Sequence, residues 1–266
     1  MWDSTAGPAL FVLGATEQEA YVIAPQYTDT TAIDSTRLDP GLLRSMQLDL
    51  FTAGSRVGQA RIRAVTGSTR TDSCRAWPSV RLDRAPVTDS ASAPEWMVAF
   101  EAKHVAEWPI DSIAGLAAAD SARMAADIAR IASSLPGDTA AAFRGLPFVV
   151  TKAWRTRAPG APQLIAAVVV RNVNQEANPR QERILLLAER DTSVAGARYT
   201  PRYAERVAGL EETVEAADLI AMVLLGSERR PTIVVAREAG AGSSYALIER
   251  IDGVWQRRWT SAYAGC

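Results

Sequence analysis

The segment Asp120–Leu135, DSARMAADIARIASSL, separates two regions of the chain that carry the patterns of β-strands. Its apolar residues recur every three or four positions, at Met124, Ile128, Ile131 and Leu135. This is the period of an amphipathic helix. Asp120 is a suitable N-cap because its carboxylate can accept hydrogen bonds from first-turn amides, and Pro136 and Gly137 end the helix. We therefore predict a helix over residues 120–135 that packs its apolar face against a sheet.

The region before this helix contains short runs in which apolar and polar residues alternate, as they do in a half-buried strand. The clearest is Met46–Val65, where Gly54 and Ser55 provide a turn between two such runs. Further strands are expected at Ala9–Leu13, Ala20–Ala24, Val80–Leu82 and Glu95–Lys103. Residues 1–109 are therefore predicted to form an N-terminal β-region, and residues 110–145 a helical connector.

Residues 146–266 contain two successive units of four strand-like runs. The first has Phe148–Arg157, Leu164–Arg171, Arg183–Glu189 and Arg198–Val207; the second has Val214–Leu225, Thr232–Arg237, Tyr245–Ile251 and Val254–Tyr263. The later runs align best, LLLAERD…ARYTPRYAERVAG with ALIERIDGVWQRRWTSAYAG. Asp252 and Gly253 favour a type I′ hairpin turn, because both tolerate positive φ. We predict an internal repeat of two four-stranded antiparallel meanders.

One of these runs is ambiguous. Residues 211–225 are rich in Glu, Ala and Leu, which favour a helix, whereas the repeat aligns them with a strand. The predicted fold class is mostly β, of the α+β type, with antiparallel meanders and one amphipathic helix between two β-rich halves. A chain of 266 residues that is 48% hydrophobic can bury a sizeable core.

Charge and hydropathy restrict the partners. A formal net charge of −1 argues against a general nucleic-acid binder, which needs a basic surplus. No apolar run reaches the roughly 18–20 residues of a membrane span, so we expect no transmembrane segment. The first residues, MWDSTAGPALFVLGA, lack the basic start of a signal peptide. The protein is therefore cytoplasmic or has lost a signal, and we prefer a periplasmic or extracellular location.

Two cysteines, Cys74 and Cys266, can form one long-range disulfide in an oxidising compartment or remain as thiols. The terminal position of Cys266 favours the bridge, because a chain end frays unless it is tied down. Two cysteines and the single histidine cannot build a structural zinc site by themselves. We expect neither a metal nor a cofactor.

The last strand-like run offers a candidate binding surface. With strict alternation, one face carries Trp255, Arg257, Trp259, Ser261 and Tyr263. Arg257 between two indoles can form cation–π contacts, so this face is a candidate platform for a glycan or a partner protein. The alternative is that Trp255 and Trp259 cap the sheet core. The loop Asn172–Asn178 is a second candidate, through Asn172, Asn174 and Glu176, unless it is only a hairpin connection.

Evidence for catalysis is sparse. His104 lies between Glu101 and Glu107 and could act as a general base or metal ligand. No serine or cysteine motif points to it, and a histidine near a strand end is commonly a surface residue. The sequence contains no phosphate-binding loop, no HExxH zinc motif and no nucleophile elbow.

The run Leu224–Trp255, LLGSERRPTIVVAREAGAGSSYALIERIDGVW, resembles the FG-GAP or VCBS repeats of bacterial propeller-like and surface proteins. In that family the loop before the apolar strand usually carries aspartates that bind calcium. Here the loop is Gly226–Arg230, with one carboxylate beside two arginines, which suits a hard cation poorly. Two units also cannot close a propeller. The resemblance therefore implies β-repeats without calcium.

We predict a non-enzymatic binding or assembly protein of the bacterial cell envelope, which could be an accessory subunit of a larger complex. A protein partner is expected and a glycan is an alternative ligand. Two other functions remain open. One is a hydrolase with a scattered site of carboxylates and His104, and the other is a purely structural β-domain. The sequence does not identify the ligand or the oligomeric state.

Overall fold

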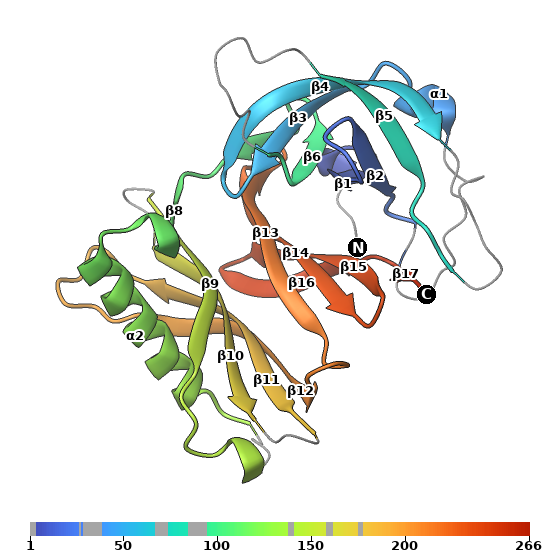
Figure 1. Cartoon of the computed structure of the whole chain (residues 1–266). Coiled ribbons are helices and arrows are strands. Elements are labelled where there is room, and N and C mark those ends of the chain that lie inside the picture. Colours follow the sequence, from blue (N-terminus) through green and yellow to red (C-terminus); the bar gives the residue numbers. More distant parts are fainter. Residues whose placement is uncertain are drawn as a thin grey trace. The chain divides into compact units, whose positions relative to one another are not determined.

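The computed structural model describes residues 4–26, 28, 39–66, 74–84, 95–137, 141–157, 162–174 and 178–266 (Figure 1). Strands make up 57% and helices 13% of the structure, which confirms the mostly β fold class. The chain forms two compact units, which are described separately. Unit 1 comprises residues 1–108, 220–236 and 241–266, and unit 2 comprises residues 109–219 and 237–240.

Unit 1 contains a closed six-stranded barrel (Figure 1). In order around the barrel, the strands are β1 (Leu10–Leu13), β2 (Glu19–Ile23), β5 (Ser79–Arg84), β4 (Ser55–Thr66), β3 (Gln47–Thr52) and β6 (Val98–Glu101). Every neighbouring pair is antiparallel. All six strands overlap runs that were predicted as strands, although β2, β4 and β5 extend beyond the predicted bounds. The short helix α1 (Pro40–Leu43) was not predicted; it begins after Asp39, whose side chain accepts from the Gly41 amide.

A second sheet has the strand order β16 (Val254–Thr260), β15 (Gly242–Ile251), β14 (Arg230–Ala239), β13 (Ala216–Leu225) and β7 (Val105–Glu107), and β17 (Ala264–Gly265) also pairs with β15. The ambiguous run 211–225 is a turn followed by strand β13. Asp252 and Gly253 both have positive φ between β15 and β16, as the predicted hairpin turn requires. In unit 1, apolar residues of the barrel and of this sheet share one core, which includes Phe51, Trp96 and Leu247.

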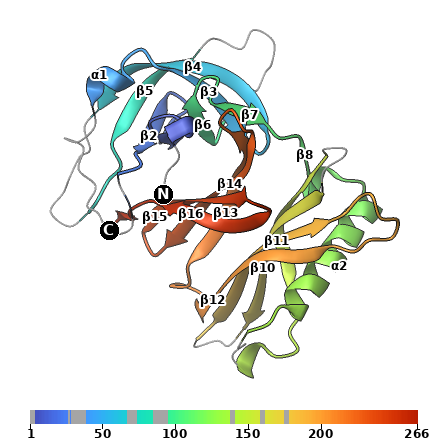
Figure 2. The same ribbon diagram turned by 180° about the vertical axis from the view of Figure 1, so that it is seen from behind.

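Unit 2 is a helix packed on a sheet. The strand order is β12 (Thr200–Leu210), β11 (Arg180–Arg190), β10 (Gln163–Val173), β9 (Val149–Thr156) and β8 (Ile110–Ser112), all antiparallel. Helix α2 (Ala118–Ser134) lies across one face of this sheet, as both views show (Figures 1 and 2). Two single turns, η3 (Ile113–Gly115) and η4 (Ala141–Phe143), flank the helix along the chain.

The predicted apolar stripe of α2 is confirmed. Met124, Ile128 and Ile131 are buried against apolar residues of β9, β10 and β11, and Leu135 is partly buried beside them. The predicted cap was wrong. The N-cap is Ala117, which makes no side-chain hydrogen bond, and Asp120 lies inside the first turn, 3.7 Å from Arg123. A carboxylate there still complements the positive end of the helix dipole.

The three predicted regions stay a prediction; the chain passes from unit 1 to unit 2 after Trp108 and returns to unit 1 at Ile220. The predicted connector, residues 110–145, is part of unit 2. The eight predicted strands of residues 146–266 are present, but β9–β12 belong to unit 2 and most of β13–β16 belongs to unit 1. The internal repeat remains a prediction.

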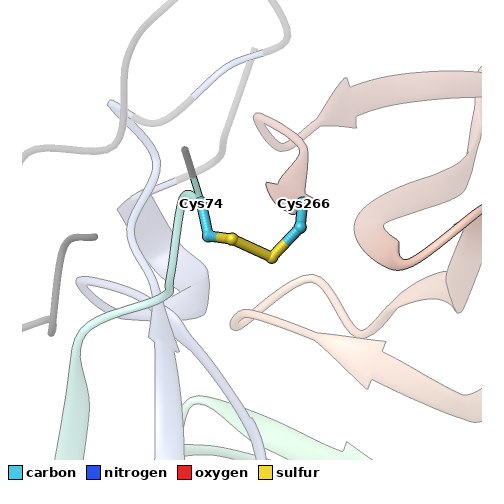
Figure 3. The surroundings of a disulfide bond; sticks show 2 residues. All are labelled: Cys74 and Cys266. Carbon is cyan, nitrogen blue, oxygen red and sulfur yellow. A yellow bond between two sulfur atoms is a disulfide. The ribbon is translucent and has the colours of Figure 1, made fainter. Parts of the chain in front are cut away.

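A disulfide joins Cys74 to Cys266 within unit 1 (Figure 3). Their neighbours Arg75 and Gly265 form an antiparallel bridge and exchange both backbone hydrogen bonds. The two cysteines are therefore directly opposed at the next position, where the strands exchange no hydrogen bond. Their Cα atoms are 4.4 Å apart, close to the spacing of about 4.5 Å typical of such a pair. The backbone pairing thus brings the two thiols into position.

Candidate functional site

The predicted aromatic–arginine face of β16 does not form. Leu247 pairs with Trp259 and Ile248 with Arg257, so Arg258 is an extra residue in a β-bulge. A bulge shifts the alternation by one residue, and Trp259 therefore faces the opposite side from Trp255. Both indoles are buried, with exposures of 4% and 5%. The exposed platform was the wrong interpretation, and the core interpretation of the two tryptophans fits.

The remaining members of that face are also separated. Arg257 is exposed, whereas Ser261 is buried: its hydroxyl oxygen accepts from the Tyr245 amide at 2.8 Å and its O–H donates to the Ala262 carbonyl at 2.7 Å. Tyr263 is 37% exposed and its ring packs against the backbone of Gly242, where a Cβ would overlap the ring. These side chains do not form one continuous surface.

The second candidate, the polar loop, is a hairpin connection. Strands β10 and β11 are antiparallel neighbours, and Asn172 pairs with Gln181 across them. Asn172 and Asn174 are exposed, and Glu176 lies outside the described residues.

The structure brings His104 close to Glu101 but not to Glu107. Nε2 of His104 lies 3.3 Å from Oε2 of Glu101, and its Nδ1 lies 2.9 Å from the Thr5 carbonyl. Because a carbonyl can only accept, Nδ1 carries the proton of that bond. Nε2 can donate to the Glu101 carboxylate only when the ring is protonated. Glu107 is directed elsewhere, since its Oε1 accepts from the Arg56 amide at 2.8 Å. These contacts tie the turn between β6 and β7 to Thr5, and β7 to β4.

Sequence reasoning missed a pocket of about 360 Å³ in unit 2, the larger of two pockets described among the placed residues. It is lined by the C-terminal turn of α2, the segment Arg144–Phe148, Arg171 from β10 and Arg206 from β12. We call it the arginine pocket. Among its lining residues three are arginines and none is acidic. Its volume lies within the range of about 300–1,000 Å³ for small-molecule sites.

A buried ion pair supports the wall of the arginine pocket. Arg171 and Glu182 are opposite each other on β10 and β11, and the Nε of Arg171 lies 2.5 Å from Oε2 of Glu182. Glu182 is 1% exposed. The guanidinium of Arg171 also lies over the ring of Phe148, at 4.4 Å from its centroid, and donates to the Leu146 carbonyl at 3.4 Å. These contacts fix the Arg171 side chain.

Arg206 links the strand to the helix. Its Nη1 lies 3.5 Å from Oε1 of Glu182, and its Nη2 donates to the Leu135 carbonyl at 3.5 Å. A cation at the C-terminus of a helix interacts favourably with the carbonyl groups that end there. Arg171 and Arg206 therefore converge on the single carboxylate of Glu182, while the exposed Arg144 lies on the segment that follows η4.

A smaller pocket of about 170 Å³ also lies in unit 2, and its charges are mixed. Its lining includes Asp120, Arg123, Asp127, Arg155, Arg190 and Tyr199. Burial raises the pKa of the Tyr199 hydroxyl, an effect that the nearby Arg190 reduces. The hydroxyl donates to Oε1 of Gln163 at 2.5 Å, and Arg190 donates to the same oxygen at 2.5 Å. With two carboxylates and three arginines in its lining, this pocket offers an anion less than the arginine pocket does.

Three further findings restrict the possibilities. Among the described residues, no three His, Cys, Asp or Glu side chains lie close enough together to hold a metal ion. Within the same ranges, no helix is both long and apolar enough to cross a bilayer. No protein-family model, curated protein or solved structure matches the chain. The resemblance to FG-GAP or VCBS repeats stays a prediction.

Proposed function

We propose that this protein is a non-enzymatic binding or assembly protein of the bacterial cell envelope, and that unit 2 binds its ligand in the arginine pocket. The observation that carries the proposal is the composition of that pocket. Three arginines and several partly exposed apolar side chains line a recess of small-molecule size, and none of its lining residues is acidic. Concave sites that combine apolar surface with a few convergent polar groups are typical of ligand binding.

The lining supports binding without turnover. It contains no His, Cys, Asp or Glu, which are the usual sources of a general base or a strong nucleophile. Its one hydroxyl, that of Ser133, donates to the Ala129 carbonyl at 2.8 Å, within the helix. The alternative hydrolase function would have to use His104 with Glu101 alone, because Glu107 binds the Arg56 amide.

The disulfide supports the proposed location. Structural disulfides persist in oxidising compartments such as the periplasm and are rare where thiols are kept reduced. The Cys74–Cys266 bridge also closes a loop that contains most of the chain, since the two residues are 192 positions apart. A protein that relies on this bridge is suited to the cell envelope or the extracellular space.

The proposal can be tested by NMR on the full-length, disulfide-bonded protein, isotopically labelled on its amides. We would titrate it with small organic anions, neutral sugars and organic amines. We expect a subset of the compounds to shift amide resonances of residues 144–148 and the end of α2, and to be recovered chemically unchanged. Conversion of a bound compound to product would overturn the non-enzymatic function. Binding of sugars at another surface, with no response from these amides, would overturn the assignment of the pocket.

A further inference from the structure

Resting on the proposed binding function, we infer that the arginine pocket accepts a small organic oxyanion, a carboxylate or phosphate group carried on an apolar body. One side of the pocket provides cationic groups and the other provides apolar surface. Either side alone would fit other ligands. The two sides together fit an anionic group that is attached to an apolar body.

The cationic side of the pocket consists of three arginines. Arg171 and Arg206 share the buried carboxylate of Glu182, and Arg144 makes no ion pair with any described residue. Guanidinium groups match carboxylates and phosphates in geometry and can bind them through two parallel hydrogen bonds.

The position of the cationic side is fixed before a ligand arrives. Arg171 is 8% exposed and is held by Glu182, by the Phe148 ring and by the Leu146 carbonyl. A side chain that is already ordered loses little conformational entropy when it binds. Arg171 therefore forms a rigid wall, and the exposed Arg144 is the group that can adjust to the ligand.

The end of α2 works against an anion, and the structure compensates for it. The last carbonyl groups of a helix carry partial negative charge, and this turn lines the pocket. Arg206 offsets this negative charge, because its guanidinium donates a hydrogen bond to the Leu135 carbonyl at 3.5 Å. An anion approaching from the pocket therefore meets the guanidinium group together with the carbonyl.

The apolar side explains why the ligand is more than an inorganic ion. Leu135 and Leu146 are partly exposed and Pro147 is exposed, and all three line the pocket. Inorganic phosphate would leave these side chains in contact with water. An apolar body attached to the anionic group would cover them, and the burial of apolar surface favours binding.

The test compares four probes by calorimetric and NMR titration of the full-length protein. They are hexanoate, hexyl phosphate, the neutral amide hexanamide and inorganic phosphate. We expect hexanoate, hexyl phosphate or both to bind at least tenfold more tightly than hexanamide and inorganic phosphate. The advantage over hexanamide should shrink as salt is raised, because the charges are partly exposed and are screened.

Three variants assign that binding to the pocket. Arg144→Gln removes an exposed charge, and we expect it to weaken the anions about threefold to tenfold without changing hexanamide. Arg144→Lys should retain part of the affinity, because it keeps the charge but not the planar fork. Arg202→Gln is the matched control, because Arg202 is on β12 like Arg206 but does not line the pocket; it should bind like the wild type. Thermal unfolding of each variant verifies that it is folded.

The outcomes separate the ligand class from the binding function. If hexanamide binds in the pocket as tightly as hexanoate, the oxyanion inference is overturned and the binding function stands. Equal affinity for inorganic phosphate and hexyl phosphate overturns the apolar half of the inference. Preference for hexanoate over hexyl phosphate, or the reverse, identifies the anionic group. If none of these probes binds and none of the compounds of the wider titration shifts the pocket amides, both proposals are overturned.

Discussion

Trp108 and Trp255 stack nearly parallel in unit 1, with ring centroids 6.5 Å apart and ring planes inclined by 8°. Trp108 follows β7, and Trp255 is near the start of β16. Both indoles are buried. The pair holds together two segments that are far apart in the sequence. This is a structural role, and not the surface recognition that was the other interpretation of Trp255.

Replacing Trp255 with alanine should therefore destabilise unit 1. Removing a buried indole leaves a cavity and unpairs the Trp108 ring, and we expect a loss of about 3–5 kcal/mol in the free energy of unfolding. Urea denaturation followed by circular dichroism measures this loss. Arg257→Ala, on the same strand at an exposed position, is the control and should change stability by less than about 0.5 kcal/mol. A Trp255→Ala protein of unchanged stability would show that the stacked pair does not hold these segments.

Replacing Ile128 with alanine should loosen the helix of unit 2 from its sheet. Ile128 is fully buried in the core formed with β9, β10 and β11, and we expect a loss of about 2–5 kcal/mol. Hydrogen exchange of the α2 amides would report this loosening locally. Arg130→Ala removes a half-exposed side chain of the same helix that pairs only with Asp127 among the described residues, so its expected effect is within about 0.5 kcal/mol. Equal exchange rates in the two variants would contradict the packing.

Some strands of this fold can be predicted from the residues next to them in the sequence, and the closure of the barrel cannot. Alternation over Met46–Val65 predicts the β3–β4 hairpin because half-buried strands repeat every two residues. Closure of the barrel depends on pairs such as Phe11 with Ala99 and Tyr21 with Ser79. Those residues are brought together by tertiary packing, and no nearby sequence pattern encodes their register.

The bulge in β16 and the arginine pocket could not be predicted from the sequence for related reasons. The bulge at Arg258 has no signature in the sequence, yet one inserted residue moves Trp259 to the other face. Arg171 is the last residue of one predicted strand, and Glu182 lies one residue before the start of the next. In the structure the two residues are paired. Correct boundaries and register would have placed the two charges opposite each other on a buried sheet. The approach of Arg206 and of the segment after η4 depends on the path of α2, which sequence periodicity does not describe.

Replacing Cys266 with serine should destabilise unit 1 and release the chain end. A disulfide that closes a long loop typically contributes about 2–5 kcal/mol. We expect a loss in that range, measured by thermal or urea unfolding of oxidised wild type and variant. The Cys74→Ser, Cys266→Ser double variant should lose no more than the single variant, because one bridge is removed in both. Additive losses would show that the cysteines stabilise the fold by separate contacts.

The same bridge tests the proposed compartment. The chain can be produced in a bacterial host with and without an export signal, and its thiols alkylated at lysis under denaturing conditions. We expect alkylation of both cysteines when the protein stays inside and of neither when it is exported. A protein that is equally stable and equally soluble in both forms would weaken the case for an envelope location.

Tyr199 should ionise late in an alkaline titration. Burial raises the pKa of its hydroxyl above the ordinary value of 10.0, and its O–H donates to Gln163. Because the pKa is higher in the folded state, this group contributes stability below pH 10 that is lost as the pH rises through the folded pKa. Absorbance near 295 nm follows ionisation, and Tyr199→Phe should remove the latest part of the change. Circular dichroism at each pH checks that the protein is still folded; an unchanged late phase in the variant would contradict the assignment.

Because of Asp111, part of the free energy of unfolding of unit 2 should depend on pH. Burial raises the pKa of this carboxyl, but hydrogen bonds from Arg155 at 3.1 Å and Arg157 at 2.6 Å outweigh burial and lower the pKa below its ordinary value of 3.8. The ionised carboxylate therefore stabilises the folded state above pH 3.8, and that contribution is lost as the pH falls through the folded pKa.

Asp111→Asn should accordingly cost about 1–2 kcal/mol at pH 7, a range reduced by solvent screening because Arg157 is 61% exposed. The difference between wild type and variant should shrink as the pH is lowered below 3.8, since the wild-type carboxyl then becomes neutral as well. Urea unfolding at a series of pH values measures it. Asp252→Asn in the exposed β15–β16 turn is the control and should differ little from wild type throughout, because asparagine also tolerates the positive φ at that position. A pH-independent loss in Asp111→Asn would mean that the charge of the carboxylate does not hold β8 to β9, and that its shape and hydrogen bonding alone do.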